Sequence, residues 1–133
     1  MVTDEPRLQA LYDFWDEKRA GRPMPARADF DPLELKPWMG HLSLVETLDD
    51  GNDFFFRVHG TVLAWRLVGE DLTGRRLMEL PYDWKELWRE EYRRVVRTRA
   101  PYVVTRKASA MKDHVGIRKL ILPLSDDGET VDM

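Results

Sequence analysis

The chain has 133 residues, of which 43% are hydrophobic and 11% aromatic, which suits one globular domain with a buried core. Its 21 Lys and Arg against 24 Asp and Glu give a net charge of −3, without the overall positive charge of a dedicated nucleic-acid binder. The absence of cysteine excludes disulfides, thiol nucleophiles and thiolate metal sites. No run approaches the roughly 18 apolar residues of a membrane span, and the charged N-terminus lacks the apolar part of a signal peptide, so we expect a cytoplasmic protein.

An amphipathic helix is predicted over residues 5–20. Acidic residues and Pro6 suit its first turn, and Gly21 ends it ahead of two prolines. Its apolar residues follow the i, i+3, i+4, i+7 spacing of one stripe: Leu8, Leu11, Tyr12 and Trp15. Two interpretations of this stripe have equal weight: a homodimer contact, or a lid over the outer face of a sheet, which Phe55 would otherwise expose.

Two strands are predicted after a proline-rich connector at 22–37, which has one helical turn at 32–35. The first strand covers 41–47, and the polar turn 49–52 leads into the second. The second strand is predicted from an alternation with a period of two residues. Side chains on one face of this strand would be Phe54, Phe56 and Val58, and those on the other face would be Phe55, Arg57 and His59.

The second half of the chain begins with short elements and continues with a long helix. A short helical segment is expected between Gly60 and Gly69, followed by a short apolar element at 77–80. The long helix starts at Asp83, which forms a sequence like a capping box with Glu86, and ends before Pro101. Two strands, 102–110 and 115–124, come next, and the turn at 125–128 predicts a further strand from about residue 129.

The phrases FRVHGT and GEDLTGRRLMEL, with the opening LYDFWDEKRAGRPMPARADFDP, resemble the PAS superfamily, particularly the short stand-alone PAS-like proteins of bacteria. The resemblance implies one α+β domain over 1–133, with a core at about 38–133. It implies an antiparallel sheet of five strands, with helices on one face and the N-terminal amphipathic helix against the other. The implied function is sensing or regulatory interaction, and PAS modules commonly pair through N-terminal helices.

The last strand of a PAS sheet lies in its middle, and the sequence supplies just 129–133 for it. Two interior strands would then lack a partner, which is costly because buried backbone groups almost always find partners. We therefore expect either that the natural protein continues for about 5 to 10 residues, or that a neighbouring molecule fills the gap.

A small-molecule pocket is predicted near the helical side of the sheet, where aromatic residues are frequent. Pockets are mostly apolar with a few polar groups that orient the ligand. The candidate ligand-binding residues, to which Phe54 and Arg66 are possible additions, are Phe56, Arg57, His59, Thr61, Trp65, Trp84, Trp88 and Tyr92. The alternative is a filled core, because large aromatic side chains normally consolidate packing. No cofactor or ligand identity follows from the sequence.

No catalytic residue and no metal site are predicted. None of His41, His59 and His114 has a ligand partner at metal-motif spacing, and no serine lies in a nucleophile elbow. His59, at a strand end, suits either a ligand or haem contact, or a structural role in which its neutral ring bonds to the backbone. An enzyme that uses His59 with a nearby acid is a less favoured alternative.

Basic residues on the long helix are predicted to form a solvated face, with Glu90 spaced to pair with two of them. Nucleic-acid binding is a weaker alternative that would use Arg93, Arg94, Arg97 and Arg106. The sequence favours a regulatory sensor domain that binds a small apolar or amphipathic ligand, mediates protein–protein interaction, or does both, as a homodimer without membrane contact. A ligand-free interaction module is the main alternative.

Overall fold

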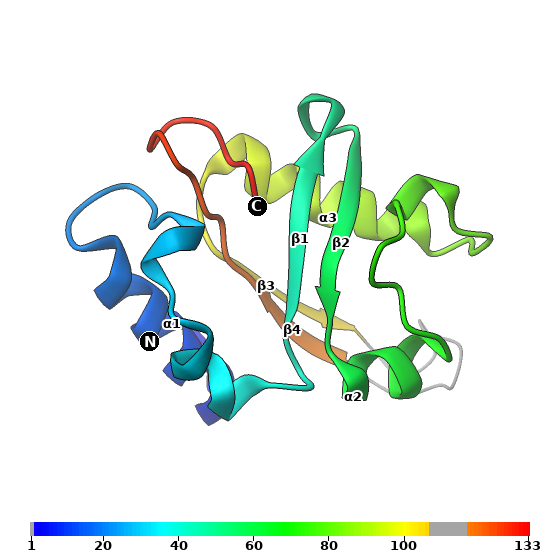
Figure 1. Cartoon of the computed structure of the whole chain (residues 1–133), viewed down its shortest axis with the longest axis horizontal. Helices are drawn as coiled ribbons and strands as arrows, with labels where there is room; N and C mark the ends of the chain where they lie inside the picture. The colour runs from blue at the N-terminus through cyan, green and yellow to red at the C-terminus, as the bar shows by residue number, and fades with distance from the viewer. Residues whose placement is uncertain (1, 107–116) are drawn as a thin grey trace.

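The computed structural model describes residues 2–106 and 117–133, and it has the predicted α+β class (Figure 1). Two antiparallel hairpins form its strands. In the first, β1 (Ser43–Leu48) pairs with β2 (Asp53–His59); in the second, β3 (Tyr102–Arg106) pairs with β4 (Ile117–Ile121). These are the four strands of the described residues, where the sequence predicted five. The predicted strand residues 107–110 and 115–116 lie outside the described part.

The first helix, α1 (Pro6–Arg19), packs on its own chain. The Glu5 carboxylate accepts the Leu8 N–H at 2.8 Å and caps the helix start. Trp15 is 3% exposed, and its indole N–H donates to the Pro123 carbonyl at 2.8 Å. The helix therefore covers the segment after β4, and the predicted contact with the outer face of β1 and β2 is wrong.

On that outer face, Phe55 is half-buried beneath the guanidinium of Arg57, whose central carbon lies 5.5 Å from the ring centre. This cation–π contact covers part of the ring that the helix was expected to shield. The sheet face thus has its own polar cover.

The connector holds two 3₁₀ helices, η1 (Arg27–Asp29) and η2 (Pro32–Trp38), so its helical part extends beyond the predicted turn. A capping box starts η2: the Asp31 carboxylate accepts the Leu33 N–H at 2.9 Å, and Glu34 accepts the Asp31 N–H at 3.1 Å. These segments share with α1 and the C-terminal residues one apolar cluster, formed by Trp15, Met24, Phe30, Leu35, Leu124 and Val131.

A β-bulge in β2 changes which side chains point inward. Leu44 pairs with Val58 and Val45 with Phe56, so Arg57 is an extra residue on the β2 side. Strict alternation predicted Val58 on the inner face and His59 on the outer face. That prediction is wrong for both: Val58 is 44% exposed and His59 is 4% exposed.

The second apolar cluster lies between β2 and α3 (Lys85–Thr98), which crosses behind the first hairpin (Figure 1). Along the chain, three short helical elements connect β2 to α3: α2 (Thr61–Leu63), the π-helical η4 (Ala64–Val68) and the 3₁₀ helix η5 (Leu77–Glu79). The buried members of this cluster are Phe54, Phe56, Val68, Leu72, Leu77, Leu80 and Trp88.

The predicted capping box of α3 is wrong. Trp84 occupies the N-cap position and makes no side-chain hydrogen bond to the helix. Glu86 instead pairs with Arg89 one turn along the helix, at 2.9 Å.

The C-terminal residues enter the space between the two hairpins. The Thr47 N–H donates to the Asp132 carbonyl at 3.0 Å, and on the other side the Leu124 N–H donates to the Met133 carbonyl at 2.9 Å. The Asp132 N–H returns a bond to the Leu124 carbonyl at 3.0 Å. No regular strand is assigned at 129–133, yet these residues occupy the place where the fifth strand was predicted to begin.

Two glycines fix the exit from β2. The Gly60 N–H donates to the Leu42 carbonyl at 2.9 Å, and the Val62 N–H donates to the Gly40 carbonyl at the same distance. A Cβ atom on Gly60 would lie 2.4 Å from the Gly40 carbonyl oxygen. Backbone therefore touches backbone here, and no side chain can be accommodated without moving β1 or β2.

Replacing Gly60 with alanine is expected to lower the free energy of unfolding by about 3 kcal/mol, because the new methyl group overlaps a backbone carbonyl. Gly74→Ala is the matched control. Gly74 has a φ of +84° and open space around its Cβ position, so its cost of about 1 kcal/mol comes from the left-handed backbone alone. Urea unfolding monitored by tryptophan fluorescence measures both, and equal losses would contradict the close approach.

Candidate ligand and partner site

A cavity of about 690 Å³ lies between β1 and β4. Its walls also include residues of α1, η2, β2 and α3. Most of the lining is apolar, with these aliphatic side chains among the members: Leu8, Leu11, Leu35, Val45, Leu120 and Leu122. A volume of this size is within the range of small-molecule sites, about 300–1,000 Å³.

One part of the wall is aromatic and carries a charge. The Lys119 ammonium lies 4.5 Å from the ring centre of Trp88 and 5.4 Å from that of Tyr92. It also pairs with Glu91 of α3 at 2.8 Å, and the Glu91 side chain is 7% exposed. The ammonium of Lys119 therefore links β4 to α3 on this part of the wall, because it contacts the carboxylate of Glu91 and two aromatic rings of that helix.

His59 lines the cavity from the end of β2. Its backbone N–H donates to the Thr73 hydroxyl at 3.0 Å, and its Nδ1 accepts the Leu72 N–H at 3.2 Å. Burial lowers the pKa of His59, because the charged ring would lose hydration, while the nearby Asp71 carboxylate raises it. The ring therefore serves as a neutral acceptor for the turn that follows η4, which is the structural role that the sequence offered as one alternative.

A family model described as a PAS domain matches residues 3–133. The chain belongs to this PAS family. No curated protein and no solved structure gave a significant match. The family supports a regulatory sensor or interaction module for this PAS domain, and it leaves ligand and partner open.

Among the predicted ligand-binding residues, the structure brings His59, Trp88 and Tyr92 together on the cavity wall, where Phe54 joins them. The others do not line it. Phe56 is completely buried in the cluster beneath α3. Thr61 and Trp65 are exposed, and the exposed fraction of Trp65 is 65%.

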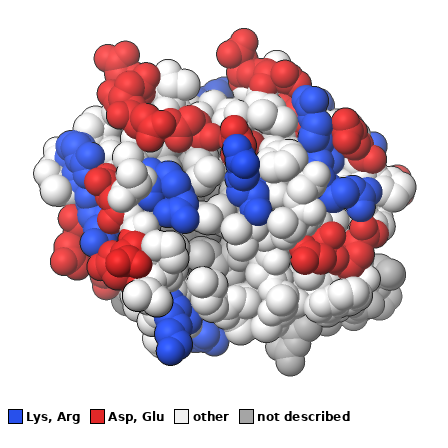
Figure 2. Space-filling model, in the orientation of Figure 1, with Lys and Arg blue, Asp and Glu red and all other residues white. Residues whose placement is uncertain are grey.

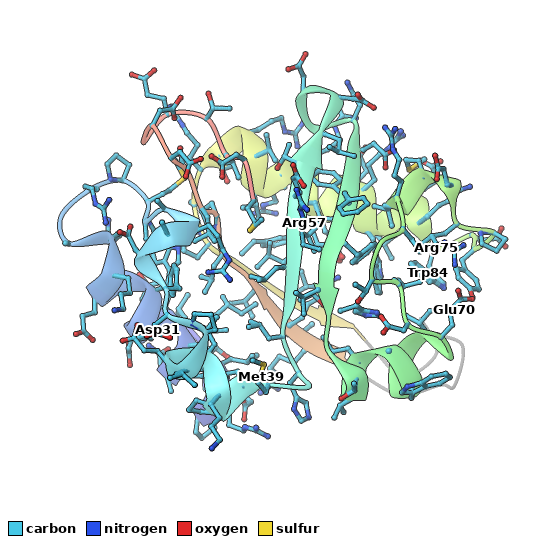
Figure 3. The ribbon with its side chains drawn as sticks, viewed as in Figure 1. Asp31, Met39, Arg57, Glu70, Arg75 and Trp84 are labelled. Carbon is cyan, nitrogen blue, oxygen red and sulfur yellow. The ribbon has the colours of Figure 1, made fainter. Side chains whose placement is uncertain are left out.

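Two more predicted residues lie away from the cavity (Figure 3). Arg57 is on the outer face of the first hairpin, where it pairs with Glu46 at 2.8 Å. Trp84 stacks on Tyr82, with ring centres 4.9 Å apart, at the far side of the PAS domain near Glu70 and Arg75 (Figure 3). The side chain of Arg66 lies outside what the structure describes.

The predicted dimer residues are involved in intramolecular contacts. Leu8, Leu11 and Trp15 line the cavity, and Tyr12 packs against the cluster around Trp15. Trp15 is too buried for a contact with another molecule. The stripe of α1 therefore lies over the cavity, and not over the outer sheet face that the lid interpretation named. The homodimer contact stays a prediction.

Several wall residues were not predicted from the sequence, namely those from η2, β1, β4 and the C-terminal segment. The signal available for them was the apolar run at 120–124, which the sequence analysis used to predict a strand. Nothing local shows that this strand and β1 face each other across an open space, since that depends on long-range placement.

The arginines of α3 behave as a solvated helix face. Arg93 pairs with Glu90 at 3.2 Å, and Arg94 lies over the ring of Tyr102 at 4.1 Å. These contacts give no support to a nucleic-acid surface on α3. The opposite side of the first hairpin, which Figure 2 shows, carries both basic and acidic side chains around an uncharged lower central area.

The described residues hold no group of three or more His, Cys, Asp or Glu side chains arranged like metal ligands. Within the same residues, no helix has the length and apolar character needed to cross a membrane. His41 is exposed, and His114 lies outside the described part. For the alternative of an enzyme using His59, the nearby acid is Asp71, whose carboxylate accepts the Thr73 N–H at 2.9 Å.

Acid is expected to destabilise the PAS domain through His59. The unfolded chain takes up a proton on this ring near its ordinary pKa of about 6.5, whereas the folded chain resists it. The free energy of unfolding should therefore decrease as the pH falls from 7.5 to 5.5. His59→Asn keeps an acceptor for the Leu72 N–H and cannot titrate, so the decrease should be smaller in this variant. Urea titrations at both pH values measure the free energy of unfolding. His41→Asn, at an exposed position, serves as the control. An identical decrease in the wild type and both variants would show that His59 does not cause the pH dependence.

The Glu91–Lys119 pair is expected to behave as a coupled unit. Lys119→Met leaves a buried carboxylate without its cation and should cost about 2 kcal/mol, less than a fully buried pair because the lysine side chain is 23% exposed. The double variant Glu91→Gln with Lys119→Met should recover more than half of that loss. A double-mutant cycle by urea unfolding measures the coupling, and additive losses would contradict it.

Proposed function

We propose that this PAS domain is a regulatory module that takes an occupant into the cavity between β1 and β4. The observation that carries the proposal is the cavity itself, which has an apolar wall and a small set of charged groups at defined places. Such a site binds small apolar or amphipathic molecules, or apolar side chains of a protein partner. Catalysis has no part in the proposal.

The position of the cavity suits regulation. An occupant would touch both hairpins together with α1 and α3, so its presence would change how these elements pack. A ligand shifts an equilibrium between two states to the extent that it binds them unequally. The Lys119 bridge between β4 and α3 is the contact through which an occupant would alter α3, because the lysine lines the cavity and pairs with Glu91.

Native and denaturing mass spectra of the freshly purified protein test this proposal. Extra mass that is lost on denaturation would identify a bound molecule. Leu120→Asp, which places a charge on the cavity wall, should then abolish the extra mass. Leu87→Asp, at an exposed position of α3 outside the cavity, should retain it. Retention in both variants would place the molecule elsewhere and reject the cavity as its site.

The second candidate is an interaction module without a small ligand. Its supporting observation is the dense packing beneath α3, where Phe56, Leu72 and Leu77 have no exposed area. Aromatic residues that the sequence offered for a ligand thus fill a core. A native mass spectrum without extra mass favours this candidate when the protein keeps its contacts with a partner.

A cytoplasmic homodimer completes the proposal. PAS domains often dimerise, and the homodimer predicted from the sequence needs a surface other than the buried Trp15. The native spectrum reports the oligomeric state. Leu11→Glu distinguishes a dimer that forms through the α1 stripe from one that forms through another surface. A dimer that persists in this variant would exclude the α1 stripe as its interface.

A further inference from the structure

We infer that Tyr82 ends a path of aromatic rings along which an electron vacancy leaves the buried Trp88. The path runs from Trp88 through Trp84 to Tyr82. At its end, the carboxylate of Glu70 takes the proton of the phenol. The path needs no occupant in the cavity, so it goes beyond the proposed function. Three observations carry it: the contacts between the rings, the lack of a proton acceptor at one end, and the presence of one at the other.

The rings of the path are in direct contact. Trp84, the N-cap residue of α3, and Trp88, one turn later, have ring centres 4.3 Å apart. On its other side, Trp84 stacks on Tyr82, with ring centres 4.9 Å apart and an angle of 10° between the planes. Electron transfer slows steeply as the gap between donor and acceptor widens, so rings in contact are favoured partners. Tyr82 and Trp84 are half-buried, whereas Trp88 is 4% exposed. The path therefore joins the core to the surface.

The indole proton of Trp88 has no acceptor within the part of the chain that the structure describes. The ring nitrogen is buried there without a hydrogen-bond partner. An oxidised indole that keeps this proton remains a radical cation, which is a strong oxidant. The Lys119 ammonium, 4.5 Å from the centre of the same ring, opposes this positive charge further, although Glu91 offsets part of the effect. An electron vacancy on Trp88 is therefore driven towards the neighbouring ring.

The phenol of Tyr82, in contrast, has a proton acceptor. Its O–H donates to the Glu70 carboxylate, and the other oxygen of that carboxylate accepts from Arg75 at 2.8 Å. These groups lie together at the side of the domain where Trp84 is found (Figure 3). The hydrogen bond from Tyr82 and, after it, the one from Arg75 lower the pKa of Glu70, so this carboxylate is ionised at neutral pH. A phenol that can release its proton is easier to oxidise than an indole, and the vacancy therefore stops at Tyr82.

The electrons and protons balance in each step. A one-electron oxidant of the free-radical class removes an electron from the indole pair of Trp84 and Trp88 and leaves a radical cation. Tyr82 then gives one electron to that radical cation and its phenolic proton to Glu70, which restores the indole and leaves a neutral tyrosyl radical. A soluble thiol gives a hydrogen atom to the tyrosyl oxygen and becomes a thiyl radical, while the proton on Glu70 passes to water. The oxidising equivalent thus leaves the core without a lasting change to Trp88.

Pulse radiolysis in azide solution tests the path. The azide radical oxidises tryptophan selectively, and transient absorption follows the conversion of tryptophanyl into tyrosyl radicals. We expect this conversion in the wild type, and Tyr82→Phe, which removes the phenolic hydroxyl group alone, should lose most of the tyrosyl signal. Tyr12→Phe is the matched control, because Tyr12 also lies beside a tryptophan but outside the path, with its ring centre 5.8 Å from that of Trp15. This control should keep the signal.

Glu70→Gln tests the proton acceptor and leaves every ring of the path in place. Glutamine accepts the hydrogen bond from Tyr82 but cannot take its proton. The conversion should then be about a hundredfold slower, which is the lower end of what a positioned proton acceptor contributes. Circular dichroism checks that each variant is folded.

The contrary outcomes are distinct. A wild type without conversion would overturn the path, and so would equal tyrosyl signals in the wild type, Tyr82→Phe and Tyr12→Phe. An equal loss in the two tyrosine variants would show that the conversion is not specific to Tyr82 and would overturn it as well. An unchanged rate in Glu70→Gln would overturn the role of the carboxylate.

Discussion

The need of buried backbone groups for hydrogen-bond partners is the constraint on which the rest of this structure depends. Within residues 2–106 and 117–133, two hairpins each pair internally, and β1 and β4 each have one edge without a partner strand. Exposed edges are ready templates for another strand. Asp132 and Met133 meet this need at one end, and the cavity occupies the remainder.

Other features of the molecule maintain the separation of the hairpins. The contact of Gly60 with Gly40 fixes the lower end of the first hairpin. The Trp15 indole ties α1 to Pro123, directly after β4. Lys119 joins β4 to α3 through Glu91, while α3 packs on β2 through the apolar cluster. The cavity is therefore bounded by elements that each have independent anchors, which suits a site that an occupant enters.

Local sequence patterns predicted most elements because those patterns act over short distances. The apolar stripe of α1 and the phenylalanine-rich strand β2 are examples, since periodicity follows directly from helix and strand geometry. The faces of β2 were predicted correctly up to Phe56. The bulge at Arg57 then exchanged the faces on which the side chains of Val58 and His59 lie. No property of these residues signals an inserted position.

The candidate site was harder to predict than the fold. His59, Trp88 and Tyr92 were found because aromatic and polar residues cluster near them in sequence. Leu120 and Leu122 were taken for an ordinary strand. Their role on the wall follows from an open edge, which is a property of how two hairpins are placed, and a single sequence does not encode such placement in any local signal.

Amide hydrogen exchange by NMR in the isolated protein tests the open edge most directly. The Thr47 N–H, which is bonded to Asp132, should exchange slowly, whereas the Val45 N–H on the same edge should exchange far faster. Slow exchange at both positions would show that the edge of β1 is already paired along its length, and it would contradict the account of an open site between β1 and β4.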